Sequence, residues 1–253
     1  MKVADRYRIG KVFISKTTPK DAEYKINEAI GSKKNSYICV CNMRSVKYGN
    51  EHEDYAEVLN NSYMSVPDGQ PLVWCAWAWG LKDVMRTNGP NLFVKMLNDT
   101  GSGVKHYLLG DTDETLNAIK EKFPNSCISG VFSPPFCELD EFVYQDIADR
   151  INKTDANIVW VSLRAPKQDY FAARLLPLLD HKVVIGVGAA FRFAIGKYHH
   201  PNRIIQELGL TGLFWRNRTI AQNIIWYSSM TWIEMKFFMN IAWRRIRGYR
   251  YDE

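Results

Sequence analysis

A single aspartate in apolar surroundings is the first candidate for chemistry. The stretch NSYMSVPDGQPLVW, residues 61–74, places Asp68 between Pro67 and Gly69. Proline limits φ and glycine tolerates a tight backbone, so this turn would fix the direction of the carboxylate. Apolar neighbours would raise its pKa toward neutrality, which suits a general base. The alternative is a turn-forming role, because aspartate often bonds to its own backbone.

A second candidate site is the stretch RAPKQD. Pro166 stiffens a loop that we expect at a strand end, and Lys167 and Gln168 offer donors that suit phosphate or uracil oxygens. The same pattern also fits an ordinary helix N-terminus with a surface lysine. The run GVGAA, residues 186–190, lacks the third glycine and the acidic partner of a dinucleotide site, so it equally fits close packing.

The elements that must position these residues alternate between strands and helices from about residue 20. We predict strands at SYICVCN, MSV, KHYLLG, CISGVF, ANIVWVSL and KVVIGVG. Helices are predicted at DAEYKINEAI, EDYAEVLNNS, PLVWCAWAWG, NLFVKMLND, DETLNAIKEKF and FVYQDIADRINK, and from RAPKQD to about Leu179. This alternation predicts an α/β fold with a doubly wound, mainly parallel sheet of the Rossmann-like type. Ligands bind beyond the carboxyl ends of such strands, where we expect Asn42, Gly110, Ser133, residues 164–168 and Gly188.

The chain changes character near Thr219. From there it reads TIAQNIIWYSSMTWIEMKFFMNIAWRRIRGYRYDE, which has helical length, many aromatic residues and a basic end. Such a segment predicts a helical, membrane-associating appendage; the alternative is a last helix packed on the core, with a solvated basic tail. We therefore divide the chain into an α/β domain, residues 1–218, and a C-terminal appendage, residues 219–253. The basic end contains Arg244, Arg245, Arg247 and Arg250.

Composition narrows the class of partner. The net charge of +6 and the pI near 9.0 point to an anionic partner. Positive charge gathers at one end beside Trp and Tyr, which favours a lipid headgroup zone over nucleic acid. The five cysteines show no CxxC pair and no ligand-spaced histidine, which predicts reduced thiols and no zinc site. The N-terminus shows no signal-peptide pattern, so we expect a cytoplasmic protein.

Six segments, in this order, resemble the WecG/TagA/CpsF glycosyltransferase family. They are NMRSVKYG, SVPDGQPLVW, RTNGPNLF, YLLGDTDET, IVWVSLRAPKQDYF and VVIGVGAAFRFAIGK, within residues 10–220. The resemblance implies an inverting enzyme that moves a sugar from a UDP-sugar to a polyprenyl-diphosphate-linked saccharide. It also implies a peripheral protein at the cytoplasmic face of the inner membrane, with no cofactor or metal. The chain likewise shows no convincing DxD motif.

The same matching assigns roles to single residues. Asp68 is expected to be the general base, with Asn42 near the reacting sugars and Arg86 neutralising the leaving diphosphate. The arginines of the basic end are expected to contact the membrane or the acceptor. The expected lining of the UDP pocket is Gly110, Ala165, Lys167, Gln168 and Gly188.

The chain departs from the family pattern near these motifs. Val40 stands where the family commonly has Thr, Ser162 and Arg164 replace glycines, and Arg192 replaces an acidic residue. These changes bear on sugar specificity and on the uridine contacts. They leave open a second hypothesis, a non-catalytic nucleotide-sugar-binding protein of the same fold.

Overall fold

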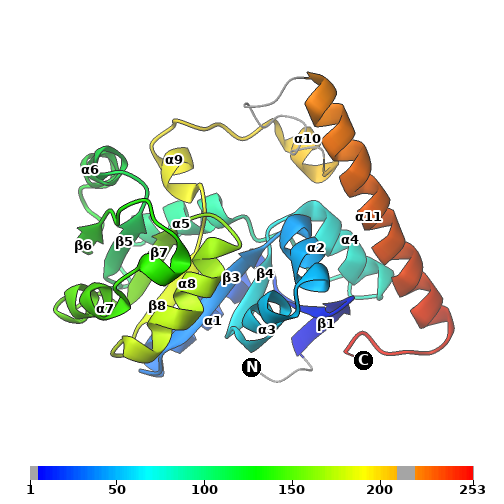
Figure 1. Ribbon diagram of the computed structural model, residues 1–253, viewed down its shortest axis with the longest axis horizontal. Helices are drawn as coiled ribbons and strands as arrows, with labels where there is room; N and C mark the ends of the chain where they lie inside the picture. Colours follow the sequence, from blue (N-terminus) through cyan, green and yellow to red (C-terminus); the bar gives the residue numbers. More distant parts are fainter. Residues whose placement is uncertain (1–4, 210–219, 253) are drawn as a thin grey trace.

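A six-stranded parallel sheet forms the centre of the protein (Figure 1). The computed structural model describes residues 5–209 and 220–252. The strands lie in the order β4-β3-β8-β7-β5-β6, and every neighbouring pair is parallel. The predicted α/β fold with a Rossmann-like sheet is therefore confirmed. The strands are β3 (Ser36–Cys41), β4 (Met64–Pro67), β5 (His106–Gly110), β6 (Ile128–Phe132), β7 (Ile158–Ser162) and β8 (Val183–Gly186).

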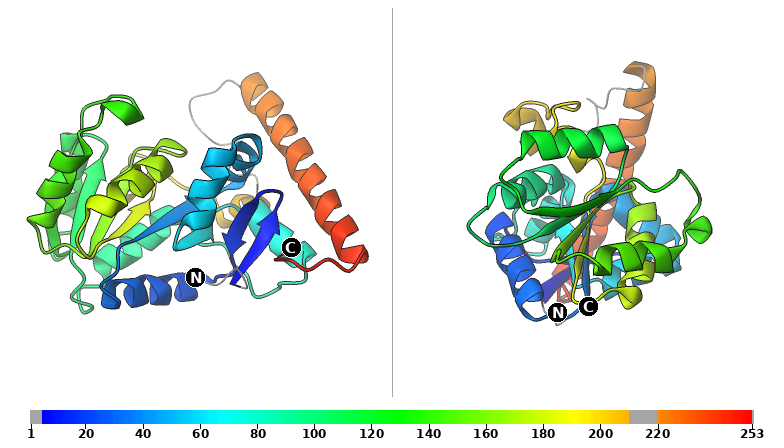
Figure 2. Two further views of the ribbon diagram at one scale, coloured as in Figure 1. Left: turned by 60° about the horizontal axis from the view of Figure 1, so that its bottom comes forward. Right: turned by 90° about the vertical axis from the view of Figure 1, so that its left-hand side faces the viewer.

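Helices cover both faces of this sheet (Figure 2). The apolar side chains of α1, α5, α6 and α9 fill the core on one face, and those of α3, α7 and α8 fill it on the other. Trp160 of β7 is fully buried, with the ring of Phe93 edge-on to it at 5.1 Å between centroids. These helices are α1 (Pro19–Gly31), α3 (Glu53–Asn61), α5 (Gly89–Asn98), α6 (Asp113–Lys122), α7 (Tyr144–Asn152), α8 (Lys167–Leu175) and α9 (Ala190–Ala194).

Local sequence signals placed most of these elements correctly. Central strands of a parallel sheet are buried on both faces, so they need continuous apolar sequence. All residues of β3 and β7 are buried, whereas those of the edge strand β6 are half-buried. Thr18 forms a capping box with Asp21 at the start of α1, and Thr112 caps α6.

The short helices α9 and α10 (Arg203–Glu207) were not predicted, and two further elements also lie outside the sequence prediction. The first is α2 (Met43–Glu51), which begins directly after β3 and has Asn42 as its N-cap. The second is a hairpin of β1 (Arg6–Ile9) and β2 (Val12–Ser15), which turns at Gly10 with a φ of +64°. The Ser65 N–H of β4 donates to Ser15 Oγ at 3.0 Å, so the hairpin packs on the edge strand.

A long C-terminal helix, α11 (Ile220–Ile246), packs along the outside of the domain (Figure 1). It lies against α4 (Gln70–Ala78) and α2, with Ile241 buried and Phe237 and Phe238 packed on the core. After it, the Tyr251 carbonyl accepts the Arg8 N–H of β1 at 2.8 Å. The predicted boundary between residues 218 and 219 lies outside the described residues. Among the helices that are described, none has the length and apolarity needed to cross a membrane.

The close approach of β5 to β7 makes a test of this fold. Gly110 has a φ of +106°, and a Cβ there would lie 2.6 Å from the carbonyl oxygen of Ser162. We expect Gly110→Ala to lower the free energy of unfolding by roughly 2–5 kcal/mol, from backbone strain plus overpacking. Gly31→Ala is the control, because nothing lies within 4 Å of a Cβ at that position. Urea unfolding of both variants measures this, and equal stabilities would contradict the strand-end geometry.

Candidate active site

Asp68 lies directly after β4, at the carboxyl edge of the sheet. Its N–H donates to the carbonyl of Cys41 at 2.7 Å, which carries the β3–β4 pairing into the turn. Its Oδ1 accepts from Asn88 Nδ2 at 3.1 Å and from the Gly89 N–H at 3.3 Å. Burial raises the pKa of Asp68, while the charge of Arg86 and these two hydrogen bonds oppose that rise. Among the described residues, none donates a hydrogen bond to Oδ2, so one oxygen is left for a substrate.

The other two residues predicted to be catalytic lie beside this turn. Asn42 follows β3, and its Oδ1 accepts the first free N–H groups of α2 at 2.9 and 3.3 Å. Gly69 packs on it, since a Cβ at Gly69 would lie 3.6 Å from the Asn42 Cβ. Arg86 donates from Nε to the Asp68 carbonyl and from Nη1 to Gln206 Oε1 at 3.0 Å. The structure thus brings Asn42, Asp68 and Arg86 together, and Gln206 of α10 (Arg203–Glu207) holds the guanidinium from outside.

The residues predicted to line a nucleotide pocket lie along the same edge, at the ends of β5, β7 and β8. The backbone of Gly188 is held on both sides: its N–H donates to Gln168 Oε1 at 2.8 Å, and its carbonyl accepts from Ser162 Oγ at 2.6 Å. Gln168 is 2% exposed, so its amide supports the Gly188 backbone from the buried side. Gly110 lies against Ser162 on the far side. Together, the backbone of Gly110 and Gly188 and the side chains of Ser162 and Gln168 form one continuous strip along this edge of the sheet.

Ala165 and Lys167 flank Pro166 in the loop that joins β7 to α8. The Ala165–Pro166 peptide is cis, and Ala165 is exposed. Lys167 Nζ donates to the carbonyl of Cys137 and lies 5.1 Å from the centre of the Phe142 ring. The ammonium group is therefore engaged with the loop that follows β6.

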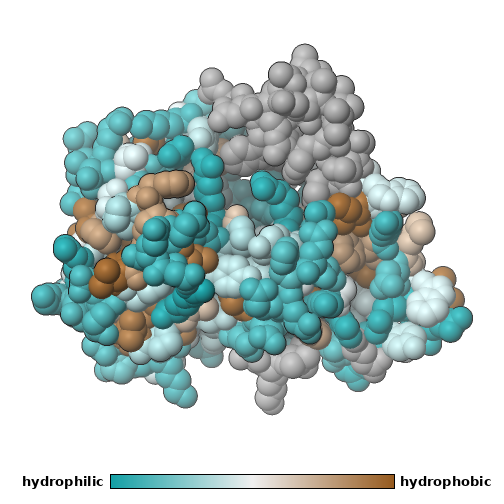
Figure 3. Space-filling model, viewed as in Figure 1, coloured by the Kyte–Doolittle hydropathy of each residue, from teal (hydrophilic) through white to brown (hydrophobic). Residues whose placement is uncertain are grey.

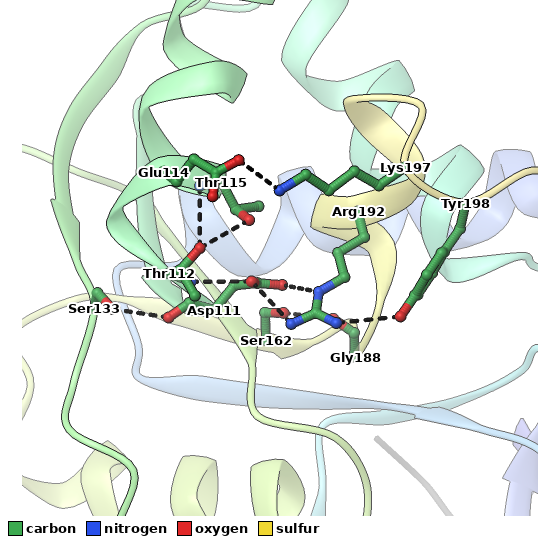
Figure 4. Close-up of polar contacts among 10 residues, drawn as sticks. All are labelled: Asp111, Thr112, Glu114, Thr115, Ser133, Ser162, Gly188, Arg192, Lys197 and Tyr198. Atoms are coloured by element: carbon green, nitrogen blue, oxygen red, sulfur yellow. Dashed lines mark hydrogen bonds and ion pairs between the residues drawn. The ribbon is translucent and has the colours of Figure 1, made fainter. Parts of the chain in front are cut away.

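A polar cluster at the ends of β5 and α9 was not assigned from the sequence (Figure 4). Arg192 makes a two-pronged contact with the Asp111 carboxylate, from Nε at 2.9 Å and from Nη2 at 3.2 Å, and donates from Nη1 to Tyr198 at 3.1 Å. The Asp111 side chain is only 4% exposed, and its φ is +59°. The contact with Asp111 raises the pKa of Arg192. The added positive charge of Arg192 is thus matched by an acidic residue from the turn that follows β5.

The four arginines of the basic end lie away from Asp68. Arg245 Nη1 donates to the carbonyl of Ala78 at 2.8 Å, at the far end of α4. Since α4 begins two residues after Asp68, its length puts about 12 Å of helix between them. The remaining contacts are Arg244 over Tyr249 at 4.7 Å, Arg247 over Trp243 at 4.3 Å, and Arg250 with Asp252 at 3.1 Å. The structure does not bring these arginines to the predicted catalytic residues.

The described part of the chain contains neither a cluster of metal ligands nor a disulfide. There, no three His, Cys, Asp or Glu side chains are grouped to hold a metal ion. All five cysteines are free, and Cys39, Cys41 and Cys75 are buried.

Comparison with known proteins identifies the family. The model of the family described as "Glycosyl transferase WecG/TagA/CpsF family" matches residues 7–250. The chain belongs to this family. It is therefore a glycosyltransferase, and the resemblance read from the motifs is confirmed.

Two curated relatives are similar to this glycosyltransferase, and both are named N-acetylglucosaminyldiphosphoundecaprenol N-acetyl-beta-D-mannosaminyltransferase. The protein of Staphylococcus aureus strain MRSA252 is 23% identical over 188 residues, which is 72% of each chain. That of Bacillus spizizenii strain W23 is 25% identical over 163 residues, which is 62% of each chain.

Sequence reasoning missed the roles of two residues that shape the site of the enzyme. Asn88 was not assigned to the site, although its side chain donates to Asp68 Oδ1. Asp111 was not assigned to the site either, and its pairing with Arg192 spans 81 residues of sequence. A partial signal was available for that pair, because Asp111 directly follows β5 and Arg192 lies in the first helix after β8.

The Asp111–Arg192 contact makes a second test. Asp111→Asn keeps a residue that tolerates positive φ but removes the charge, which leaves Arg192 partly buried without its counterion. We expect a loss of about 1–2 kcal/mol in the free energy of unfolding, since Arg192 is 33% exposed and partly screened. Glu114→Gln removes the exposed pair with Lys197 and should cost less than about 0.5 kcal/mol. Denaturant unfolding of both variants decides this, and similar losses would mean that burial adds nothing to the Asp111 contact.

Proposed function

We propose that the enzyme transfers a sugar from a UDP-sugar to a polyprenyl-diphosphate-linked saccharide with inversion, and that Asp68 is the general base. The observation that carries the proposal is the state of the Asp68 carboxylate. It is half-buried with a pKa raised by burial, it is fixed through Oδ1 by two neutral donors, and its Oδ2 accepts no hydrogen bond from the described residues. A base with a raised pKa and one available oxygen suits removal of a hydroxyl proton near neutral pH.

The proposed step is a single displacement. The acceptor hydroxyl gives its proton to Asp68 Oδ2 as its oxygen bonds to the anomeric carbon of the donor. The bond from that carbon to the diphosphate oxygen breaks, and UDP leaves with the electron pair. Arg86 is fixed beside the base by Gln206 and the Asp68 carbonyl, so its positive charge needs no reorganisation to stabilise the departing diphosphate.

The donor and acceptor classes rest on different support. The strip around Gly188 adjoins the Asp68 turn, because a Cβ at Gly89 would lie 3.1 Å from Val40 and 3.9 Å from the Val187 carbonyl. This neighbourhood supports a nucleotide along β8, β7 and β5 with its sugar directed at Asp68. The acceptor is proposed to be a polyprenyl-diphosphate-linked N-acetylglucosamine, since that group stands in the names of both relatives. The reaction serves assembly of a surface polysaccharide.

The outer face of α11 supports binding to a membrane surface. Its exposed apolar side chains recur at helical spacing, while its opposite side packs on the domain. Lys236 and Arg247 lie over Trp232 and Trp243 at 5.4 and 4.3 Å, which places cations beside the aromatic rings. The apolar and aromatic surface is visible along the right-hand edge of Figure 3. The exposed residues are Trp232, Met235, Met239, Trp243 and Ile246. We propose that the enzyme is peripheral at the cytoplasmic face of the inner membrane.

Asp68→Asn tests the proposed base. The amide cannot accept a proton, so we expect transfer to fall by about 10²–10⁴-fold while UDP-sugar affinity stays within about twofold. Radiolabelled UDP-sugars and a polyprenyl-diphosphate-linked N-acetylglucosamine report the rates. In wild type, kcat/KM should fall as the pH drops through the raised pKa of Asp68, because the base must be ionised.

Asp99→Asn is the matched control, since Asp99 is exposed at the end of α5 and loses the same charge. Equal transfer by Asp68→Asn and Asp99→Asn would return Asp68 to a turn-forming role. UDP-sugar binding by wild type without transfer to any acceptor of this class would instead favour the non-catalytic binding protein.

Trp243→Glu tests the membrane face. The substitution places a carboxylate in the apolar stripe, and we expect at least a tenfold loss of binding to vesicles that contain anionic lipid. Tyr24→Glu makes the same kind of change at an aromatic residue of α1 that is 72% exposed, and it should bind like wild type. Vesicle flotation compares the two, and equal flotation would refute α11 as the binding face.

A further inference from the structure

Two hydrogen bonds tie α3 to α8 in a reciprocal arrangement. The Tyr55 hydroxyl of α3 donates to Asp169 Oδ2 of α8 at 2.6 Å. The next residue of α8, Tyr170, donates to Oδ2 of Asp54 on α3, also at 2.6 Å. The first bond is buried and the second is exposed, so the same chemistry occurs in two very different environments.

Asp169 is the unusual member of this set. It is 2% exposed, and it takes no part in the proposed transfer step. Its Oδ1 is buried and makes no hydrogen bond among the described residues. This oxygen and the Gln168 amide nitrogen both lie over Gly186, at 3.1 and 2.9 Å from the position of a Cβ there. A larger residue at Gly186 would therefore displace both side chains.

A short series of contacts runs from Asp169 to the proposed donor pocket. Gln168 adjoins Asp169 in sequence, and its Oε1 accepts the Gly188 N–H. Gly188 is held on its other side by Ser162. The amide of Gln168 can support Gly188 only when its oxygen faces that N–H and its NH₂ group faces the other way, over Gly186.

The charge of Asp169 is sensitive to pH near neutrality. Burial raises its pKa from the ordinary 3.8 to about 7, against smaller opposing effects of Tyr55, Cys39 and Gln168. The titratable groups that face it are Tyr55 from α3 and Tyr37, Cys39 and Cys41 from β3, and burial raises the pKa of each well above neutrality. Asp169 is the member of this cluster that changes charge between pH 5 and 9.

Retaining this carboxyl costs stability. The folded protein keeps the proton between about pH 4 and 7, where the unfolded chain has already lost it. The free energy of unfolding therefore falls as the pH rises through that window. A buried group that destabilises the fold at working pH is typical of a functional constraint.

We propose that Asp169 is a positioning residue of the donor pocket: its carboxylate, held by Tyr55, fixes the orientation of the Gln168 amide and so the Gly188 backbone that receives the donor. This inference rests on the proposed UDP-sugar donor. An ionised carboxylate only accepts hydrogen bonds, so it attracts the NH₂ side of the amide and leaves Oε1 for Gly188. A protonated carboxyl can donate to Oε1, which competes with the Gly188 N–H. Donor binding thus depends on ionised Asp169.

The test measures the affinity of the full chain for a UDP-sugar by calorimetry from pH 5.5 to 8.5. A UDP-sugar is the probe because its diphosphate does not titrate in this range, unlike that of free UDP. Wild-type affinity should weaken as the pH falls below about 7. Asp169→Asn, which imitates the protonated acid, should bind about five- to tenfold more weakly at pH 8 and lose the pH dependence. Tyr55→Phe removes a donor to the carboxylate, so its loss of affinity should begin at higher pH.

Tyr170→Phe is the control, because it removes the exposed member of the reciprocal pair and should keep the wild-type profile. Wild-type affinity and pH dependence in Asp169→Asn would overturn the inference. A wild-type protein that binds no UDP-sugar at pH 8 would instead refute the proposed donor, and the inference with it.

A second readout needs no donor. The midpoint temperature of thermal unfolding should be higher for Asp169→Asn than for wild type, by a margin that grows from pH 4 to 7, because the variant lacks the titrating carboxyl. A margin that is constant with pH would show that Asp169 does not change charge in this window and would also overturn the inference.

Discussion

Three carboxylates lie near the carboxyl edge of the sheet, with the side chains of Asp111 and Asp169 buried and Asp68 half-buried, and the helices around that edge are placed by how each is satisfied. A desolvated carboxylate costs free energy unless a neighbouring element supplies donors. Asp68 takes neutral donors from the start of α5, Asp111 takes the guanidinium of Arg192 from α9, and Asp169 takes a hydroxyl from α3. Full neutralisation by a cation makes Asp111 a fixed structural group. Burial raises the pKa of Asp68 and of Asp169, and the groups around each oppose that rise only in part, so these two remain able to exchange protons.

The parallel sheet is what brings these groups together. Strands β3 and β8 are neighbours in space but are separated by most of the chain, and their ends carry the two halves of the site. Gly89 touches both, through Val40 and the Val187 carbonyl. On the opposite face, the reciprocal bonds between α3 and α8 join the same halves. In the proposed reaction, the base and the donor pocket are thus fixed relative to each other from both sides of the sheet.

The sequence was sufficient wherever a local signal decides the structure. Buried strands need continuous apolar sequence, and Thr18 caps α1 as its spacing predicts. The motifs also located Asn42, Asp68 and Arg86, which the structure brings together. The hairpin and α2 were not predicted, because the first is fixed by packing on β4 and the second begins with no break after a strand. The direction of side chains could not be predicted from the sequence either. Lys167 donates to the carbonyl of Cys137, and this contact depends on the position of another loop.

The C-terminal helix packs on the core along one side and exposes large apolar residues along the other. Ile241 is buried and Phe237 packs on the core, whereas Trp243 is 49% exposed on the other side. A helix that only packed on the domain would have no reason to expose large apolar residues at helical spacing, since a polar face is favoured in water. With 27 residues, α11 extends about 40 Å, so a membrane that holds its outer face would lie along the domain and not end-on to it. In that orientation the lipid-linked acceptor would approach Asp68 from the side of α4 and α2. The arginines at the far end would then serve mainly to fix how the enzyme lies on the membrane, because α4 separates them from the proposed reaction.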